Sequence, residues 1–428
     1  MIIRSRLVTY VHLDYILSPM QKRALVLGAG LIGGPIAVDL ARSGNIEVTI
    51  ADISDEALEK TRRLFMRVGT GTDVTMSSFQ NNAMMRRLIH DQDMVVSAVP
   101  GSHGLSVLRS VLNECKPVVD ISFGGHDPFS ECDADAKAAG VPAAVDCGVA
   151  PGMSHMLIGK ALQSLTHIDS ARIDVGGLPM EPKPPHFYKA PFAPASVIDE
   201  YTRSAGFLEN GTVRYTEPLS EIQEVEIPTA GTFEAFRSDG LRTLLRTMQG
   251  VRNLSEWTLR YPGHLALMKS MRDAGDFNED NLTSTLLALK KEWELGDDPD
   301  RTIMRVTVDG WNGATPMRHS WMLKDEKTAG IHSMARTTGS TAALVARLIL
   351  DGKLSAPGII APEQIGANKQ WMDFIMNGME ERGIHYSYSV GGAQELKEKL
   401  PPTEPTTISS LGTLSSTFAL PGSGGQAG

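Results

Sequence analysis

Residues 25–34 read LVLGAGLIGG and set the first strict limit on the fold, because three glycines spaced G-x-G-x-x-G suit a tight turn between a strand and a helix. Residues 22–28 form a short apolar run stopped by glycine, which is typical of a strand buried on both faces. The residues that follow, up to Ala41, have the broad apolar faces of a buried helix. A second strand-like run ends at Asp52, and Ser54 is placed to cap a charged helix.

The same alternation continues along the first third of the chain. Apolar runs at 93–100 and 116–122 indicate two more strands, and 141–148 is predicted to be the last one. Helical segments follow Gly104 and cover 131–140. Strands and helices that alternate without hairpin signals predict an α/β fold with a doubly wound parallel sheet, that is, a Rossmann domain.

From about residue 150 the pattern changes to mixed helices and strands, so we expect a second, α+β domain. A strongly amphipathic helix at 335–354 is expected to return and pack on the first domain. The last residues are rich in Pro, Ser, Thr and Gly, which predicts disorder. The predicted organisation is an extension at 1–19, a Rossmann domain at 20–150, an α+β substrate and dimerisation domain at 151–330, returning C-terminal helices at 331–390 and a disordered tail at 391–428.

Composition narrows the partners of this 428-residue chain. Its formal net charge of −9 argues against nucleic acid or an anionic membrane as a partner. It has three cysteines and no His/Cys cluster with metal-ligand spacing, so we expect no metal site and a reducing, cytoplasmic location. No apolar run reaches the roughly 18 residues that span a bilayer.

The glycine-rich segment has the context that a dinucleotide site requires. Gly28 permits the tight turn, Gly30 lets the backbone approach a pyrophosphate, and Gly33 lets the helix sit close to the strand. The start of that helix offers free N–H groups and a positive dipole end to phosphates. The alternative is a glycine turn in some other α/β protein, with Asp52 serving only as a helix-capping acid.

The acid at the end of the second strand favours NAD as the cofactor. Asp52 can accept hydrogen bonds from both ribose hydroxyls, and it would repel the 2′-phosphate of NADP. Neither Ile53, Ser54 nor Asp55 could pair with that phosphate. The loop after the third of these strands is expected beside the ribose and nicotinamide. The predicted cofactor-binding residues are Gly28, Ala29, Gly30, Leu31, Ile32, Gly33, Asp52, Ala98, Val99, Pro100 and Asp120.

The second half carries two polar segments with arginine, 237–243 and 258–264, each bounded by Gly or Pro. The fork of an arginine suits bidentate binding of an amino-acid carboxylate, and either Arg242 or Arg260 could provide it. On the alternative interpretation, each is a surface arginine paired with a neighbouring acid.

Five segments in order, GAGLIGGPIA, DCGVAPGMSHMLIGKAL, GTFEAFRSDGLRTL, TLRYPGH and MARTTGSTAALVARLIL, resemble the saccharopine dehydrogenase family, and within it most closely the lysine 6-dehydrogenases. The similarity runs from about Arg23 to Gly366. It implies an NAD-binding Rossmann domain, an α+β substrate domain, a returning C-terminal helix and a homodimer. Its substrate segment corresponds to Thr258, Leu259 and Arg260, which favours Arg260 over Arg242 as the carboxylate ligand, and its polar loop supplies Asp239.

The resemblance also implies a reaction. The terminal amine carbon of L-lysine would pass a hydride to NAD, and hydrolysis of the imine would release ammonia and leave allysine, which cyclises. Asp239 or Glu234 could hold the α-ammonium group. The sequence leaves the proton acceptor open: His126, Asp120, Tyr188, Lys189 and His264 are candidates, and desolvation of the amine could replace a dedicated base.

Two other functions stay open. A saccharopine reductase or a related carboxylated-amine dehydrogenase would need a second cationic ligand, which Arg203, Arg237 or Arg242 could supply. A protein that binds NAD as a sensor would keep the fold without the chemistry.

Overall fold

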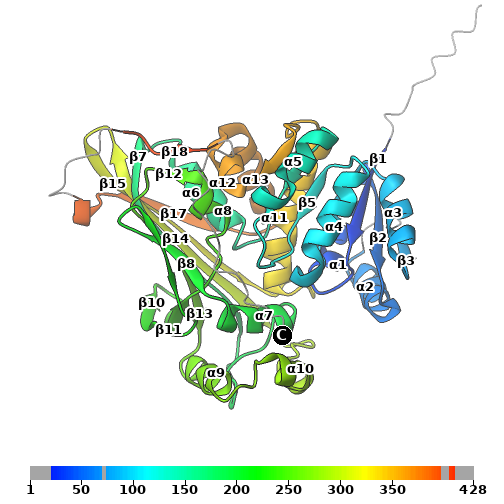
Figure 1. Cartoon of the computed structure of the whole chain (residues 1–428), viewed down its shortest axis with the longest axis horizontal. Coiled ribbons are helices and arrows are strands. Elements are labelled where there is room, and N and C mark those ends of the chain that lie inside the picture. Colours follow the sequence, from blue (N-terminus) through cyan, green and yellow to red (C-terminus); the bar gives the residue numbers. More distant parts are fainter. Residues whose placement is uncertain (1–20, 70–73, 397–403, 410–428) are drawn as a thin grey trace, which may run out of the picture.

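The computed structural model describes residues 21–69, 74–396 and 404–409, and these residues form two large β-sheets and one two-stranded sheet, with helices packed around them (Figure 1). The predicted extension at 1–19 lies outside the described residues. No helix among those described is long and apolar enough to cross a membrane.

The first sheet has seven parallel strands in the order β16-β6-β5-β4-β1-β2-β3, so the predicted doubly wound sheet is confirmed. Strand β1 is buried on both faces from Ala24 to Leu27, as its apolar run predicts. The Ser54 side chain accepts a hydrogen bond from the Ala57 N–H and caps α2 as expected. The elements are β1 (Lys22–Leu27), α1 (Gly33–Ala41), β2 (Ile46–Asp52), α2 (Asp55–Val68), β3 (Val74–Ser78), α3 (Asn82–His90), β4 (Met94–Ser97), α4 (Gly101–Asn113), β5 (Val118–Asp120), α5 (Pro128–Ala139) and β6 (Pro142–Ala144).

Two strands of this sheet were not predicted from the sequence. Strand β3 lies at the edge and its side chains are only partly buried, so it lacks the apolar run that marks the other strands. Strand β16 (Gly358–Ile360) comes from the C-terminal part of the chain and pairs with β6. The prediction that 141–148 is the last strand of the sheet is therefore wrong. Strand β16 was not predicted because its three residues are too few to give a periodic pattern.

The second sheet has nine strands, mostly antiparallel, in the order β10-β11-β13-β7-β14-β15-β17; β8 also pairs with β13, and β9 pairs with β8. This mixed arrangement confirms the α+β prediction. Its elements are α6 (Met153–Ala161), β7 (His167–Pro179), α7 (Pro194–Thr202), β8 (Ala205–Glu209), β9 (Thr212–Thr216), β10 (Ile222–Ile227), β11 (Gly231–Arg237), α8 (Thr243–Thr247), β12 (Met248–Gln249), β13 (Asn253–Arg260), α9 (His264–Asp273), α10 (Glu279–Glu292), β14 (Asp300–Asn312), β15 (Thr315–Glu326) and β17 (Tyr386–Gly391).

The C-terminal elements connect the two sheets. Helix α11 (Ser333–Leu350) lies between them, in contact with α1 and with β14 (Figure 1). Helices α12 (Pro362–Ala367) and α13 (Lys369–Glu381) follow, and β17 then returns to the second sheet rather than to the first.

The expectation of disorder over 391–428 is wrong where residues 404–409 are described. There, β18 (Thr407–Ile408) pairs with β12. The Thr406 hydroxyl also accepts a hydrogen bond from the Ile168 N–H at 2.9 Å. Backbone pairing of this kind needs no apolar composition, so the sequence gives no sign of it.

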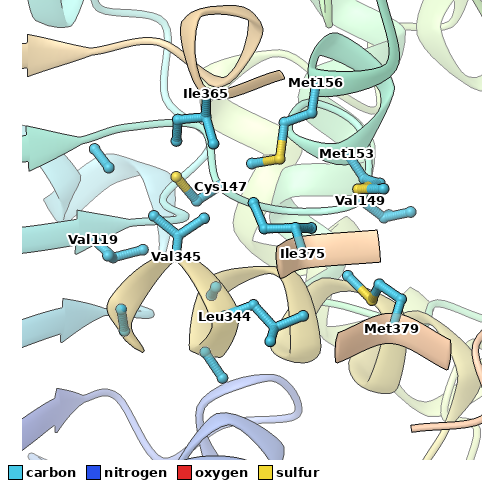
Figure 2. Close-up of a cluster of buried hydrophobic side chains, with 14 of the residues drawn as sticks. Val119, Cys147, Val149, Met153, Met156, Leu344, Val345, Ile365, Ile375 and Met379 are labelled. Carbon is cyan, nitrogen blue, oxygen red and sulfur yellow. The ribbon is translucent and has the colours of Figure 1, made fainter. Parts of the chain in front are cut away.

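One hydrophobic cluster joins the two domains, and Figure 2 shows its centre. Side chains from β5, the junction between the domains, α6 and the three C-terminal helices converge there. Every one of them is buried, so this cluster fixes how the two sheets sit against each other. Its labelled members are Val119, Cys147, Val149, Met153, Met156, Leu344, Val345, Ile365, Ile375 and Met379.

A buried carboxylate adds a polar link at the same boundary. Asp39 of α1 is 7% exposed and accepts two hydrogen bonds from Arg382, at 2.5 and 2.6 Å. Arg347 of α11 donates to the Asp39 backbone carbonyl at 2.8 Å. This bidentate pair ties the C-terminal helices to the first helix of the chain.

We expect Asp39→Asn to lower the free energy of unfolding by about 3 kcal/mol, because Arg382 would lose its anion in a largely buried position. Denaturant unfolding followed by circular dichroism measures this. The control is Asp93→Asn, which weakens the exposed pair between Asp93 and Arg23 and should cost less than about 1 kcal/mol. Equal losses in the two variants would contradict the role given to Asp39.

Candidate active site

A single cavity of about 820 Å³ runs from the glycine-rich loop of the first domain to the face of β13 in the second. Its walls come from the ends of β1, β2, β4 and β5, from the junction at 146–151, and from β7, α7 and α11. A ligand crevice at the carboxyl ends of parallel strands is the expected place in this class of fold.

The three glycines each occupy a position that their spacing predicts. Gly28 has φ +99°, and a Cβ there would stand 2.5 Å from the Ala98 carbonyl oxygen. A Cβ on Gly33 would overlap the Gly28 carbonyl. Gly30 is different, because a Cβ there would meet no atom within 4 Å and would project into open space at the cavity. The loop therefore forms a shallow site lined by backbone atoms, which we call the cradle, and its shape suits a pyrophosphate.

The first turn of α1 has no side-chain cap: the residue before it, Ile32, makes no side-chain hydrogen bond to the helix. Leu31 and Ile32 line the cavity at this point. Uncapped N–H groups at a helix start suit a phosphate, which supplies the missing acceptors.

Asp52 lies at the end of β2 and lines the cavity, as predicted. Its carboxylate accepts hydrogen bonds from the Ala29 N–H at 2.6 Å and from the Ser54 N–H at 2.8 Å. Each carboxylate oxygen keeps a lone pair for another donor, so the group is held in place and can still bind ribose hydroxyls. The predicted cofactor residue Ala29 does not itself line the cavity, and its N–H holds the Asp52 carboxylate.

The loop after β4 also lines the cavity, at Ala98, Val99 and Pro100. The predicted cofactor residue Asp120 does not line it. Asp120 is 2% exposed and accepts a hydrogen bond from the Ser122 hydroxyl at 2.6 Å. Burial raises the pKa of this carboxyl to about 6. Asp120 ends β5, at the same edge of the sheet as the cavity, but its side chain is buried in the protein.

In the second domain, β13 presents alternate side chains to the cavity. Glu256, Thr258 and Arg260 line it, whereas Trp257 and Leu259 belong to the hydrophobic cluster on the opposite face of the sheet. Successive side chains of a strand point to opposite faces, which explains the division. The assignment of the Leu259 side chain to the substrate site is therefore wrong.

Arg260 is 2% exposed and is held by three hydrogen bonds. It donates to Glu200 of α7 at 2.7 Å, to the Tyr201 hydroxyl at 2.8 Å and to the Leu259 carbonyl at 3.0 Å. The Tyr188 ring lies 4.6 Å from the guanidinium carbon. Burial raises the pKa of the Glu200 carboxyl, against the effect of Arg260.

Two other predicted substrate residues lie behind the cavity wall. Asp239 pairs with Arg203 at 3.0 Å, and Arg242 pairs with Asp146 at 2.7 Å. The Phe123 ring, which lines the cavity, stacks on both arginines. The structure thus brings Thr258 and Arg260 to the cavity but not Asp239 or Arg242.

None of the proton-acceptor candidates from the sequence lines the cavity. Tyr188 packs under Arg260, and His264 bonds to the Tyr201 hydroxyl at 2.9 Å. Lys189 pairs with Asp298 on the surface. His126 lies beside Gly124, and burial lowers its pKa. Glu234, proposed for the α-ammonium group, accepts a hydrogen bond from the exposed Gly263 N–H instead.

Three acidic side chains that line the cavity were not predicted as site residues: Asp146, Glu200 and Glu256. Glu256 could have been found, because it stands two and four positions before Thr258 and Arg260 on the same face of one strand. Glu200 carries no such signal, since α7 approaches Arg260 only in the folded chain. No group of three or more potential metal ligands occurs among the described residues.

Two family models match the chain in succession. One, described as the saccharopine dehydrogenase NADP binding domain, covers residues 24–144. The other, described as the saccharopine dehydrogenase C-terminal domain, covers residues 148–384, which is more than half of the chain. The chain belongs to the saccharopine dehydrogenase family. It is accordingly an oxidoreductase, a dehydrogenase with a nucleotide-binding domain, and the resemblance seen in the sequence is confirmed at the level of the family.

Named relatives agree with this assignment. Saccharopine dehydrogenase (NADP(+), L-glutamate-forming) of Saccharomyces cerevisiae is 21% identical over 452 residues, which span 86% of this chain and 98% of that protein. The mitochondrial alpha-aminoadipic semialdehyde synthase of Rattus norvegicus is 26% identical over 209 residues, 47% of this chain and 22% of that protein.

A solved structure shares the fold. The apo saccharopine dehydrogenase (L-Glu forming) of S. cerevisiae matches with a TM-score of 0.69 at 18% identity, covering 87% of this chain and 100% of that one. The likeness to lysine 6-dehydrogenases within the family stays a prediction.

We expect Gly30→Val to weaken dinucleotide binding about tenfold or more, because the new side chain would start in the open space of the cradle, where its Cβ meets no atom within 4 Å. Fluorescence titration with NADH measures the binding, and thermal unfolding should stay unchanged. Gly391→Val is the matched control, since Gly391 in β17 also has open space around it but lies away from the cavity. NADH affinity equal in both variants would contradict the cradle.

Proposed function

We propose that this dehydrogenase oxidises the 6-amino group of L-lysine, with NAD as the hydride acceptor, and releases ammonia and allysine. The observation that carries the proposal is the charge of the cavity. Arg260 is the only arginine or lysine among the described residues that line it, whereas Asp146, Glu200 and Glu256 line the same substrate half. A small cationic substrate with a single carboxylate matches that balance.

The Arg260–Glu200 pair has the right chemistry for the α-carbon end of an amino acid. Three of the five N–H groups of Arg260 are used within the protein, so two remain for a substrate carboxylate. Glu200 lies beside that guanidinium and could accept the α-ammonium group. An acid and a base side by side are complementary to a zwitterion.

The named relatives keep a second substrate class open. Saccharopine carries further carboxylates and would need further cations. Arg203 and Arg242 are the nearest, but each already has an acid partner, and Phe123 separates both from the cavity. Arg237 pairs with Glu221 and stacks on Trp257, which lies on the other face of the sheet. A saccharopine-type substrate would thus require Phe123 to move.

The cofactor half of the cavity favours NAD over NADP. Asp52 stands where the adenosine ribose is expected, and no arginine or lysine lines that half among the described residues. A 2′-phosphate would meet a carboxylate without a compensating cation. NADP, which is named for the yeast relative and in the family model, is the alternative cofactor. A comparison of the two binding affinities distinguishes NAD from NADP.

The chain's own part in the reaction is to orient the substrate and to prepare the amine. A bound nicotinamide supplies the site that accepts a hydride. Arg260 and Glu200 hold the α-carbon end, which leaves the side chain of lysine to extend along β13. A neutral amine is needed before its carbon can be oxidised, and burial in the cavity favours the neutral form of an amine.

We expect NADH to form when the purified protein is mixed with NAD and L-lysine, and not with saccharopine. Arg260→Lys should lower kcat/KM for lysine about 10- to 100-fold, because an ammonium group cannot replace a bidentate fork. Arg237→Lys is the matched control and should leave kcat/KM unchanged. NADH formed only with saccharopine would overturn the substrate, and no reaction with any amine despite NAD binding would favour a sensor.

We expect wild-type protein to bind NAD more tightly than NADP, and Ile53→Arg to raise the affinity for NADP about tenfold or more. Ile53 is exposed and follows Asp52 at the cavity, so a cation there would face the 2′-phosphate. Calorimetry with each dinucleotide measures both affinities, with Ile53→Met as the uncharged control. Tighter binding of NADP by the wild type would overturn the cofactor proposal.

The homodimer and the cytoplasmic location implied by the resemblance and the composition stay predictions.

A further inference from the structure

We propose that Glu256 is the proton acceptor for the side-chain amine of the substrate. This role rests on the proposed function, and it assigns to β13 both ends of the substrate: the carboxylate at Arg260 and the reacting amine at Glu256.

The Glu256 carboxylate is buried yet incompletely bonded. The residue is 5% exposed and lines the cavity, and its Oε2 has no hydrogen-bond partner. Its other oxygen, Oε1, accepts a hydrogen bond from the Ser238 hydroxyl at 3.3 Å. A buried carboxylate oxygen without a donor is costly, and a bound ammonium group would supply the missing hydrogen bond.

The surroundings hold this carboxylate in one place. Ser238 itself accepts a hydrogen bond from the Thr258 hydroxyl at 2.7 Å, so two hydroxyls support Oε1 in series. Gly240 leaves room for the group, because a Cβ there would overlap both carboxylate oxygens. The Gly240 carbonyl is fixed in turn by His155 of α6 at 2.9 Å.

The spacing along β13 matches the length of lysine. Glu256 and Arg260 lie four residues apart on one face of a strand, a separation of about 13 Å between their backbones. An extended lysine measures roughly 7 to 8 Å from its carboxylate carbon to its terminal nitrogen by ordinary bond lengths. Both side chains project from that face into the same cavity, so an extended lysine lying along the strand can make a hydrogen bond of about 2.9 Å at each end.

The orientation also places the reacting end toward the first domain. Arg260 is surrounded by Tyr188, Tyr201 and Glu200, which belong to the second domain. Near Glu256, by contrast, the loop at 238–242 reaches the first domain, where Arg242 binds Asp146 and the Gly124 carbonyl. The amine end of the substrate is therefore the end that faces the dinucleotide.

Glu256 differs from the two other acids of the substrate half. Glu200 pairs with Arg260, and Asp146 pairs with Arg242. An arginine partner already occupies a carboxylate oxygen, and a proton would have to displace that partner. Within the part of the chain that the structure describes, Glu256 has no ion pair of this kind, so its carboxylate is the one available to take a proton.

The charges around Glu256 favour its role as a proton acceptor. Burial, followed by the charges of Asp239 and Glu200, raises the pKa of Glu256 to about 8, while Ser238 and Arg242 act in the opposite direction. Asp146 and Arg260 are the other charged groups on this part of the wall. A base whose pKa lies near neutral pH is best matched to proton transfer.

The step balances with NAD as the oxidant. The N–H bond of the ammonium group breaks, its proton moves to Oε2, and the nitrogen keeps the electron pair. That pair forms the C=N bond as the neighbouring carbon gives up a hydride. Water then adds to the carbon, the C–N bond breaks with release of ammonia, and the proton on Glu256 passes to solvent when the product leaves.

We expect Glu256→Gln to lower kcat about 100-fold or more with little change in KM. In the wild type, kcat/KM should rise with pH to a midpoint near 8, as Glu256 ionises, and fall as free lysine loses its own proton near about 10.4. The rise near 8 should be absent in Glu256→Gln. Glu200→Gln is the matched control: it should raise KM for lysine and keep a rise, moved to lower pH because the Glu200 charge that raises the Glu256 pKa is removed.

Binding gives a readout that needs no turnover. Calorimetry of L-lysine with the NADH-loaded protein at pH 7, in two buffers of different ionisation enthalpy, should show nearly one proton released per site, because the bound ammonium converts the protonated Glu256 to a carboxylate. Glu256→Gln should release none, and thermal unfolding verifies that it is folded.

The outcomes separate the two proposals. If the wild type oxidises lysine, and Glu256→Gln retains more than a tenth of kcat or keeps the rise near pH 8, the role of Glu256 is wrong and the proposed function stands. If the folded wild type does not oxidise lysine, both are wrong.

Discussion

The burial of α11 is the constraint on which the rest of the molecule depends. Most of its eighteen residues are buried, so the helix must be covered on several sides at once. Helix α1 and β5 cover it from the first domain, and β14 covers it from the second. Because the same helix packs against both sheets, they are held at a fixed separation, and the cavity lies between them with the glycine cradle on one wall and β13 on the other. The Asp39–Arg382 pair fixes the last of the returning helices to α1.

The alternation of β13 then decides the chemistry of the second wall. One face of the strand supplies Trp257 and Leu259 to a hydrophobic cluster, while the other places Glu256, Thr258 and Arg260 in the cavity. A buried arginine and a buried carboxyl group at the two ends of one strand face are costly unless each finds a partner. Arg260 pairs with Glu200, whereas Glu256 has no cationic partner among the described residues. A lysine can therefore bind along this face with its carboxylate at Arg260 and its terminal ammonium at Glu256.

Much of this could be predicted from the sequence, and the exceptions have physical causes. The fold of the first domain could be predicted because most of its strands are continuous apolar runs. Gly28, Gly30 and Gly33 also have backbone roles that favour glycine. Strand β3 and strand β16 were not, since one is a half-buried edge and the other has three residues. In the site, Arg260 was found through its neighbours in sequence, whereas Glu200 meets it only through the packing of α7.

Asp239 and Arg242 show the limit of reasoning from residue type. Both are charged residues in a loop near the substrate half of the cavity. Asp239 pairs with Arg203 and Arg242 pairs with Asp146, and the Phe123 ring stacks on both arginines. Whether a charged side chain faces a ligand or a partner depends on tertiary contacts that the sequence does not display. Asp120 illustrates the same point in the first domain, where a strand-end acid turns inward.

A crystal structure of the protein with NADH and L-lysine tests the central claim most directly. The account predicts the α-carboxylate on Arg260, the α-ammonium on Glu200 and the terminal nitrogen within hydrogen-bond distance of Glu256 Oε2, with the neighbouring carbon toward the nicotinamide. A lysine bound in the reverse direction, or with its terminal nitrogen away from Glu256, would contradict it.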